Sequence, residues 1–449
     1  MSEVIKIKRG LDIPLMGKAD QIYVKSDLPN LFALKPTDFN GLTPKLEKKP
    51  GEKVKAGTVL FHDKYRPEIK FVSPVSGELL AVNRGERRKI LEIVIKSDDK
   101  FEKEDFGKDD LSKLSREKVI DKMLGAGVWP FIRQRPYDII ASPEDKPKAL
   151  FISGFDTAPL APDYDFILTG KEAEFQAGIE VLRILSEDNV HIGINNRSSS
   201  KVYKSLKGVK LHSFEGPHPA GNVGIQLHHV LPVCKGDKVW VTQPQDVITI
   251  GKLFTEGVFD ASRTVVLAGS EVKKKGYYNT MIGASIALMV ENNLEQDNVR
   301  YISGNVLTGT KIDKDGYLGF YHSQVTVIPE GNYYEFMGWA MPGFGKYSVS
   351  RSYFSWLCKK KEYRLDSNLH GGKRAFVVSG QYEKVLPMDV LPEFLFKAII
   401  TEDIDKMEQL GIYEIVEEDV ALCEFVDTSK IDIQQIVRDG IELMIKEVG

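Results

Sequence analysis

The order of a strand, a helix and a second strand in the middle of the chain constrains the fold more than any other feature. Residues 149–153 and 190–194 are short apolar runs typical of buried strands, and residues 172–185 lie between them. The intervening residues repeat apolar side chains at helical spacing: Phe175, Ile179, Leu182 and Leu185. Two strands joined by a helix run parallel in one sheet. The pattern therefore predicts an α/β domain with a parallel sheet.

The first hundred residues have a different pattern, in which short apolar segments alternate with glycine and proline. Residues 49–60, 69–80 and 90–95 are such segments. Strands at this spacing are typical of a sandwich or a barrel. The region resembles half of the motif of biotinyl and lipoyl carrier domains, and Lys64 lies near the hairpin tip where those domains carry a modified lysine. A purely structural barrel is the alternative.

Beyond the central domain, the pattern is first mixed and then helical. Residues 276–290 are the best uncharged helical run, whereas strands dominate residues 300–328. The last part of the chain has amphipathic helical patterns at residues 391–400, 404–410 and 431–447. We therefore expect a multidomain α/β plus β protein with a helical C-terminal tail.

Composition argues against several classes of protein. The chain has 61 Lys and Arg against 64 Asp and Glu, which argues against a general nucleic-acid binder but permits a local basic patch. Its three cysteines, Cys234, Cys358 and Cys423, form no CxxC pair for a zinc ribbon or a cysteine-ligated iron–sulfur cluster. The run 276–290 is shorter than the ~20 residues that a bilayer requires. Without a signal-peptide pattern, we expect a reducing compartment, and any membrane contact through a partner or a surface.

A glycine loop follows the helix predicted at residues 115–125. Residues 125–130 have the sequence Gly-Ala-Gly-Val-Trp-Pro. Backbone N–H groups of such loops can hold a phosphate. This loop lacks the third glycine of GxGxxG and the Lys-Ser/Thr pair of a P-loop. A simple turn is therefore the main expectation, and a phosphate-binding loop is the alternative.

Two further groups of residues are candidate binding sites. Arg133 and Arg135 follow Trp129 and Phe131, and such a combination can hold a planar or anionic ring, although solvated surface arginines are the alternative. Clustered histidines suggest a metal, but no Asp, Glu or Cys stands at ligand spacing, and neighbours in a strand face opposite sides. A rigid turn with hydrogen-bonded histidines is preferred to a metal site for these residues: His218, His228 and His229.

Many longer stretches, taken in order, resemble one family: the A subunit of the bacterial sodium-translocating NADH:quinone reductase. The resemblance runs nearly end to end. It is carried by residues 5–14, 59–64, 82–85, 214–221, 245–254, 306–310 and 338–343.

The resemblance implies a six-subunit complex that passes electrons from NADH through flavins and iron–sulfur centres to a quinone and pumps sodium outward. The A subunit of that complex is peripheral and lies on the cytoplasmic face of the bacterial inner membrane. It sits on the membrane-embedded B subunit, and it has been associated with quinone binding. The resemblance thus implies ubiquinone or menaquinone as substrate. NADH and flavins would be handled by other subunits, and no nucleic acid is an expected partner.

A more distant resemblance links the chain to the flavin subunit of respiratory complex I and the C subunit of the Rnf complex. Those relatives have a longer glycine loop for the flavin phosphate, whereas the corresponding residues 124–130 have one glycine fewer and contain Trp129. Their C-terminal cysteine clusters correspond here to residues 421–427, where Cys423 stands alone. A single thiolate cannot hold a four-ligand cluster. We therefore expect a chain without its own redox cofactor.

The resemblance also implies a division into four parts. These are a barrel-sandwich domain (1–100), a Rossmann-like α/β domain (101–257), an α/β and β-grasp-like region (258–380) and a helical tail (381–449).

Three hypotheses follow: a cofactor-free subunit of a quinone-reducing complex, an FMN-binding flavoprotein, and a carrier modified at Lys64. Under the first, a quinone needs aromatic walls, donors for its carbonyls and an apolar exit for its tail. The sequence offers Trp129 and Phe131 as walls. The candidate donors are Arg133, Arg135 and His218. The apolar loop 28–34, with Leu31 and Phe32, is the candidate path for the tail. In the alternative, the aromatics plug a vacated flavin cavity.

Overall fold

The predicted parallel strands form the centre of a seven-stranded sheet in the computed structural model, which describes residues 4–198, 202–338, 340–358 and 360–448. Strand β11 (Ala149–Ser153) pairs in parallel with β12 (Val190–Asn195), as the sequence predicts. Strand β11 pairs on its other side with β14 (Val239–Thr242), also in parallel. The complete order is β1 (Val4–Lys6), β13 (Lys210–Glu215), β12, β11, β14, β9 (Arg133–Arg135) and β10 (Ile139–Ile140).

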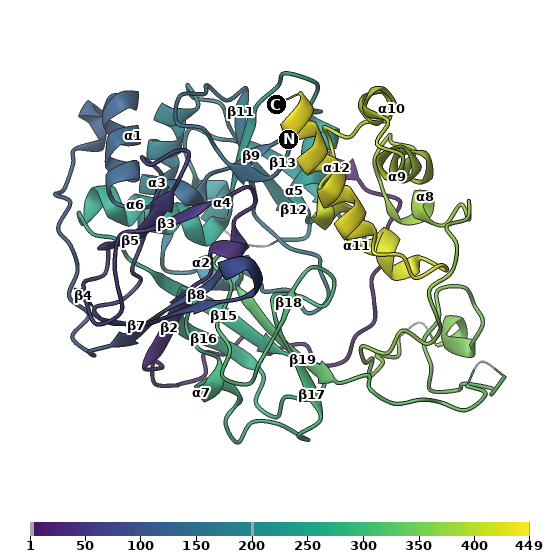
Figure 1. Ribbon diagram of the computed structural model, residues 1–449. Coiled ribbons are helices and arrows are strands. Elements are labelled where there is room, and N and C mark those ends of the chain that lie inside the picture. Colours follow the sequence, from purple (N-terminus) through teal and green to yellow (C-terminus); the bar gives the residue numbers. More distant parts are fainter. Residues whose placement is uncertain (1–3, 199–201, 339, 359, 449) are drawn as a thin grey trace.

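Helices cover both faces of this sheet (Figure 1). Leu150 and Ile152 of β11 belong to the same core as helices α3 (Glu172–Leu185) and α6 (Pro244–Thr255). Phe151, between them in the strand, faces the opposite side and packs with Leu227 of α5 (Val223–Val230). This alternation follows from the two-residue period of a strand. Helix α1 (Arg116–Gly125) begins, as predicted, after Ser115, whose hydroxyl caps it. Two short helices complete this part: α2 (Tyr164–Leu168) and α4 (Val202–Ser205).

The N-terminal region forms two small sheets, which agree with the predicted sandwich or barrel. One sheet has the order β2 (Leu31–Leu34), β8 (Ile90–Ser97), β7 (Gly77–Arg84) and β4 (Lys53–Val54). The other has the order β3 (Pro44–Leu46), β5 (Val59–Asp63) and β6 (Lys70–Val72). Short 3-10 turns lie at Pro36–Asp38, Glu86–Arg88 and Leu111–Lys113. The first strand, β1, instead joins the edge of the central sheet through β13.

A third, five-stranded sheet follows in the chain, and it corrects one expectation. Its order is β16 (Gly276–Met281), β15 (Ser262–Ala268), β19 (Gln324–Pro329), β17 (Val299–Ser303) and β18 (Thr310–Ile312). The prediction of a helical run at 276–290 is wrong, because its first half is strand β16 and only α7 (Ala287–Val290) is helical. Tyr277, Tyr278 and Thr280 suit a strand, and β15 supplies the antiparallel partner.

The C-terminal part is helical, as expected, and packs beside the central sheet (Figure 1). Its helices are α8 (Tyr382–Val385), α9 (Pro392–Ile400), α10 (Ile404–Gln409), α11 (Glu417–Val426) and α12 (Ile433–Glu447). Sequence analysis missed α11, which carries Cys423 in its buried face. Between β19 and α8 the chain has little regular structure apart from a 3-10 turn at Phe354–Leu357.

Helices α3 and α6 touch through glycine, which gives a first prediction. A Cβ atom at Gly178 would lie 2.1 Å from the carbonyl oxygen of Val247. We expect Gly178→Ala to lower the free energy of unfolding by about 1–3 kcal/mol, although alanine has the better helix propensity. The reason is that the backbone of helix α6 at Val247 would have to move away from the new methyl group. Gly125→Ala is the control, since that site is open, and should change stability by less than about 0.5 kcal/mol. Urea unfolding of both variants measures this, and equal stabilities would contradict the prediction.

Candidate functional site

A cleft lies where the order of the parallel strands reverses. Strand β11 continues to β12 on one side, and the chain later returns to place β14 on the other side. Ligands of open α/β sheets bind in the crevice outside the carboxyl ends of strands at such a point. Here Ser153 at the end of β11 and Thr242 at the end of β14 line a cleft of about 720 Å³.

Four parts of the chain contribute the walls of this cleft. The barrel region supplies Thr37, Asp38 and Asn40, and the loops of the third sheet supply residues around 304–310 and 320–324. The C-terminal helices close one side with this set: Glu417, Glu418, Glu424, Asp432, Gln434, Gln435 and Arg438. The site is therefore built by tertiary structure and not by one motif.

Carboxyl groups outnumber basic groups in this lining. It contains seven carboxyl groups, two arginines and one histidine: Asp38, Asp138, Asp156, Glu417, Glu418, Glu424, Asp432, Arg133, Arg438 and His322. Arg133 is already paired with Asp138 at 2.9 Å, and Arg438 with Glu417 at 2.6 Å. The cleft consequently disfavours an anionic ligand.

Burial shifts the pKa of several of these carboxyl groups. It raises the pKa of Asp38, of Asp156 and of Glu424 above their ordinary values. Burial, together with the neighbouring carboxyl of Asp419, raises the pKa of Glu418 to about 7. A protonated carboxyl group donates a hydrogen bond. At neutral pH the Glu418 carboxyl can therefore offer a donor to a neutral ligand with carbonyl oxygens.

Uncharged polar and aromatic groups complete the lining. Thr242 is 5 % exposed, and its hydroxyl has no hydrogen-bond partner within the described part of the chain. An unpaired buried hydroxyl is costly, so it marks a place where a ligand or water can bind. Tyr164, Phe320 and Tyr321 also line the cleft, and the Arg133 guanidinium lies 4.8 Å from the centre of the Tyr321 ring.

A buried ion pair positions the helical wall. Arg135 at the end of β9 is 2 % exposed and donates to the Asp419 carboxylate of α11 at 3.0 Å. Glu418 and Asp138 lie 3.6 and 3.9 Å from the same guanidinium. Asp419 also accepts from the backbone N–H of Val416 and so closes the first turn of α11.

Family comparisons agree with this architecture along most of the chain. Three family models match: the "NqrA N-terminal barrel-sandwich hybrid domain" at residues 5–98, the "NqrA second alpha/beta domain" at 114–259 and the "NQRA C-terminal domain" at 264–314. Curated proteins named as the A subunit of the Na(+)-translocating NADH-quinone reductase match nearly end to end. That of Yersinia pestis bv. Antiqua is 38% identical over 439 residues, covering 97% of this chain and 98% of the relative. The chain belongs to this family.

Two other members of the family support the same conclusion. The protein of Vibrio anguillarum is 37% identical over 447 residues, and that of Photorhabdus laumondii is 36% identical over 447 residues. Each match covers 99% of this chain and 100% of the relative. The barrel-sandwich and second α/β domains expected from the sequence are thus confirmed, whereas the Rossmann-like and β-grasp-like details stay predictions.

The aromatic candidates of the sequence analysis lie in the protein interior. Trp129 is fully buried, donates its indole N–H to Ala141 at 2.8 Å and packs edge-on against Trp240. Phe131 is 1 % exposed and stacks on Phe320, so it supports the cleft wall from behind. Neither side chain reaches the cleft surface.

The remaining candidates are dispersed, and only Arg133 lines the cleft. Arg135 is held in the ion pair with Asp419. His218 is 4 % exposed, and its Nδ1 atom lies 3.0 Å from the Thr157 hydroxyl. The expected apolar loop 28–34 contains strand β2, in which Phe32 is fully buried and pairs with Ile95 of β8. Leu31 and Phe32 therefore pack in the barrel, away from the cleft lining.

Sequence reasoning missed Tyr164, Tyr321 and Thr242. One signal was available for Thr242, because it ends the buried strand Val239–Thr242, next to the carboxyl end of β11. Tyr164, at the start of helix α2, and Tyr321, in a loop, reach the same place only through tertiary packing.

The glycine loop does not offer phosphate donors. The backbone N–H groups of Ala126, Gly127 and Val128 all donate to carbonyl groups of helix α1. A Cβ atom at Gly127 would lie 2.4 Å from Val72 of the barrel, so the barrel occupies the space beside the loop. The arrangement matches a packed turn, and the residues do not fit an FMN phosphate at this position.

The other sequence motifs concern metals, membranes and a carrier lysine. The described residues contain no group of three or more His, Cys, Asp or Glu suited to a metal ion. His228 and His229 lie on helix α5 and not on a strand, and His228 bonds Glu414 at 2.8 Å. No helix in the described ranges has the length and apolar character needed to span a bilayer. Lys64 is exposed beside the Asp63–Arg66 ion pair, and its modification stays a prediction.

The ion pair of Arg135 and Asp419 gives a second prediction. We expect Arg135→Met to lower the free energy of unfolding by about 3–5 kcal/mol, because it leaves the Asp419 carboxylate buried without its partner. Lys146→Met is the control, since the Lys146–Glu187 pair is largely exposed and should contribute less than about 1 kcal/mol. Chemical unfolding of the two variants tests this. A loss no larger than that of the control would show that the pair does not hold the helices.

The buried histidines give a third prediction. Burial lowers the pKa of His218 to about 4, below its unfolded value. The unfolded chain therefore binds the proton first, and stability should fall as the pH drops from about 6.5 to about 4. His218→Gln should reduce this loss by about 1–3 kcal/mol. Unfolding midpoints measured across this pH range provide the test, with pH 8 as the reference. An identical pH dependence in the variant would refute it.

Proposed function

We propose that this chain is the peripheral A subunit of a Na(+)-translocating NADH:quinone reductase, lacks a redox cofactor of its own and contributes to quinone binding and to assembly of the complex. The observation that carries the proposal is the end-to-end similarity to the named relatives, at 38% identity over 439 residues. The expected partners are the other members of a six-subunit complex on the cytoplasmic face of the bacterial inner membrane, first among them the membrane-embedded B subunit. NADH and flavins are assigned to those other subunits.

We further propose that the cleft at the ends of β11 and β14 holds the quinone headgroup. A headgroup is planar and neutral, and it has two carbonyl acceptors. The cleft provides aromatic side chains, Tyr164 and Tyr321, together with the Thr242 hydroxyl, which has no partner among the described residues, and the Glu418 carboxyl, whose pKa is raised to about 7. Its volume of about 720 Å³ lies within the range of small-molecule sites.

Charge supports a quinone over a nucleotide in this cleft. NADH and FMN carry phosphate groups, and seven carboxyl groups against two paired arginines would repel them. A quinone has no such charge. The FMN alternative also lacks support at the glycine loop, where the barrel residue Val72 fills the space beside Gly127.

A fourth prediction tests this site with a variant that should not disturb folding. Thr242→Val keeps the shape of the side chain and removes a hydroxyl that has no partner among the described residues. We expect a short-chain ubiquinone to bind the variant about five- to tenfold more weakly, as the loss of one hydrogen bond implies. Calorimetric titration of the purified chain measures the affinity.

Thr280→Val is the matched control. Thr280 is also 5 % exposed with an unpartnered hydroxyl, but it lies on β16 outside the cleft lining. Its variant should bind the quinone as the wild type does. Equal affinities of the wild type and Thr242→Val, or equal losses in both variants, would remove the cleft as the quinone site.

A further inference from the structure

One segment differs from the rest of the molecule in composition. Residues 331–380, here called the aromatic–basic segment, contain eight Lys and Arg against three Asp and Glu. The whole chain has a small excess of acidic residues, so this segment is a local basic patch. It also contains 11 of the 43 aromatic residues. It lies between strand β19 and helix α8, at the lower right of Figure 1.

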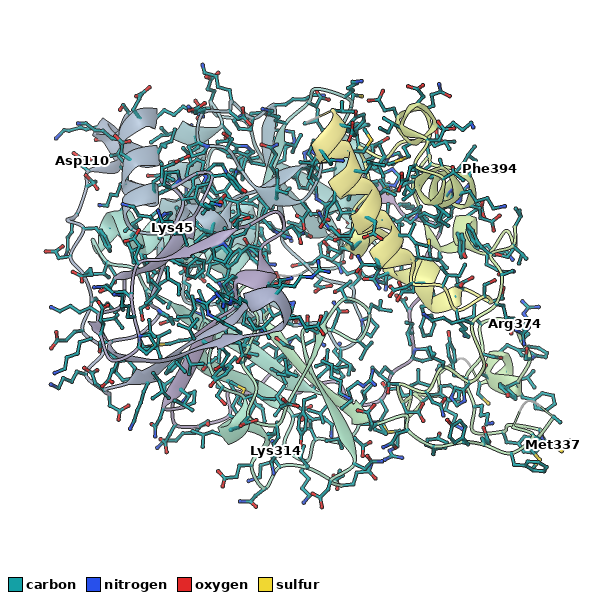
Figure 2. All side chains as sticks on the ribbon, in the orientation of Figure 1. Lys45, Asp110, Lys314, Met337, Arg374 and Phe394 are labelled. Atoms are coloured by element: carbon teal, nitrogen blue, oxygen red, sulfur yellow. The ribbon has the colours of Figure 1, made fainter. Side chains whose placement is uncertain are left out.

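Several aromatic side chains of this segment are exposed on the surface of the protein. Tyr334 is 104% exposed, Phe336 is 89% exposed and Phe344 is 77% exposed. Single exposed apolar residues are ordinary, but a concentration of large ones marks an interaction surface. Figure 2 places Met337, which is 49% exposed, at the outer edge of the molecule beside this group.

The base of the segment is firmly attached, so its outer part is presented in a defined place. Tyr363 exchanges backbone hydrogen bonds with Pro14 and Met16 at 2.7 and 2.9 Å. Arg364 makes a two-bond ion pair with Glu271 at 2.7 and 2.8 Å. Further out, Phe344 and Phe354 stack on each other at 5.7 Å. The exposed rings are therefore not the ends of a detached tail.

We propose that the aromatic–basic segment binds the surface of an anionic phospholipid bilayer. Aromatic rings and Lys or Arg together are typical of protein surfaces at the membrane–water boundary, where rings enter the headgroup layer and cations meet lipid phosphate. Protein–protein interfaces, by contrast, are depleted in lysine. Five of the eight basic residues here are lysines: Lys346, Lys359, Lys360, Lys361 and Lys373. With eight Lys and Arg against three Asp and Glu, the segment has an excess of positive charge that is complementary to anionic lipid, and this favours lipid as the occupant.

The surface and the cleft are separate. No residue of the segment lines the cleft, and the cleft is acidic whereas the segment is basic. The inference rests on the proposed place of the chain in a membrane complex. Its test does not use quinone, so vesicle binding and quinone binding can fail independently.

The fifth prediction is that the purified full chain sediments with phosphatidylcholine vesicles that contain phosphatidylglycerol, and not with phosphatidylcholine alone. Lys360→Glu with Lys361→Glu should weaken this binding at least 25-fold, because each lysine near an anionic surface contributes about fivefold. Added salt should weaken the wild type in the same direction. Both lysines are exposed, so folding should not change.

A second variant tests the rings. Tyr334→Ser with Phe336→Ser removes the most exposed aromatics and should also reduce vesicle binding. The control for charge is Lys45→Glu with Lys49→Glu, and the control for apolar surface is Leu80→Ser with Leu91→Ser, all exposed in the barrel region. Thermal unfolding confirms that each variant is folded.

The possible outcomes separate lipid from other partners. Vesicle binding that is lost in the segment variants and kept in the barrel variants supports the proposal. Binding that is equal on neutral and anionic vesicles, absent altogether, or unchanged by the segment variants overturns it. If vesicles fail to bind but the segment variants lose their association with the membrane subunits, the surface is a protein interface and the lipid proposal is wrong.

Discussion

The buried ion pair between Arg135 and Asp419 is the interaction on which the arrangement of the molecule depends. Its partners lie 284 residues apart in the chain and come from the central sheet and helix α11. Neither charge is stable in the interior alone, so each requires the other, and the pair joins helix α11 to the central sheet. Glu417 and Glu418 come directly before Asp419 and line the cleft, so their position follows from this pair. A second buried pair, Arg263 with Asp246 at 2.8 Å, joins the third sheet to helix α6 on the opposite side.

Local patterns in the sequence were sufficient to predict helices that have a periodic apolar face or a capping residue. Helix α3 has an apolar face at helical spacing and lies between two buried strands in the sequence, so its own pattern and its neighbours both predict a helix between parallel strands. Helix α1 begins at a capping serine. The prediction failed for β16, because an uncharged run with both aromatic and small residues suits a strand or a helix equally. Strand β15, which lies before it in the chain and pairs with it along its whole length, decides the outcome. Such long-range pairing has no local pattern.

The candidate site was harder to predict than the fold, for a related reason. Two aromatic and two cationic side chains lie within seven residues of the sequence, and this suggested a binding site for a planar ring: Trp129, Phe131, Arg133 and Arg135. In the structure the two aromatic residues enter the core, and Arg135 is used in the ion pair, so only Arg133 faces the cleft. The other cleft residues come from segments that are hundreds of residues apart. Their meeting depends on the strand order, and that order places the ends of β11 and β14 side by side.

The near balance of charge in the whole sequence hides two opposite surfaces. Carboxyl groups are concentrated around the cleft, whereas acidic residues are sparse between residues 331 and 380, so that segment has an excess of basic residues. An acidic cleft selects against phosphate-bearing ligands and leaves neutral planar ones, because an anion would lose its hydration without gaining a counter-charge. A basic, aromatic surface selects the opposite class, namely extended anionic surfaces with an apolar layer beneath. Under the proposed lipid contact, separation of the two surfaces would keep the acidic cleft away from the anionic headgroups. The net charge of the chain is therefore uninformative about binding, and the distribution of charge over the fold is what determines the ligands.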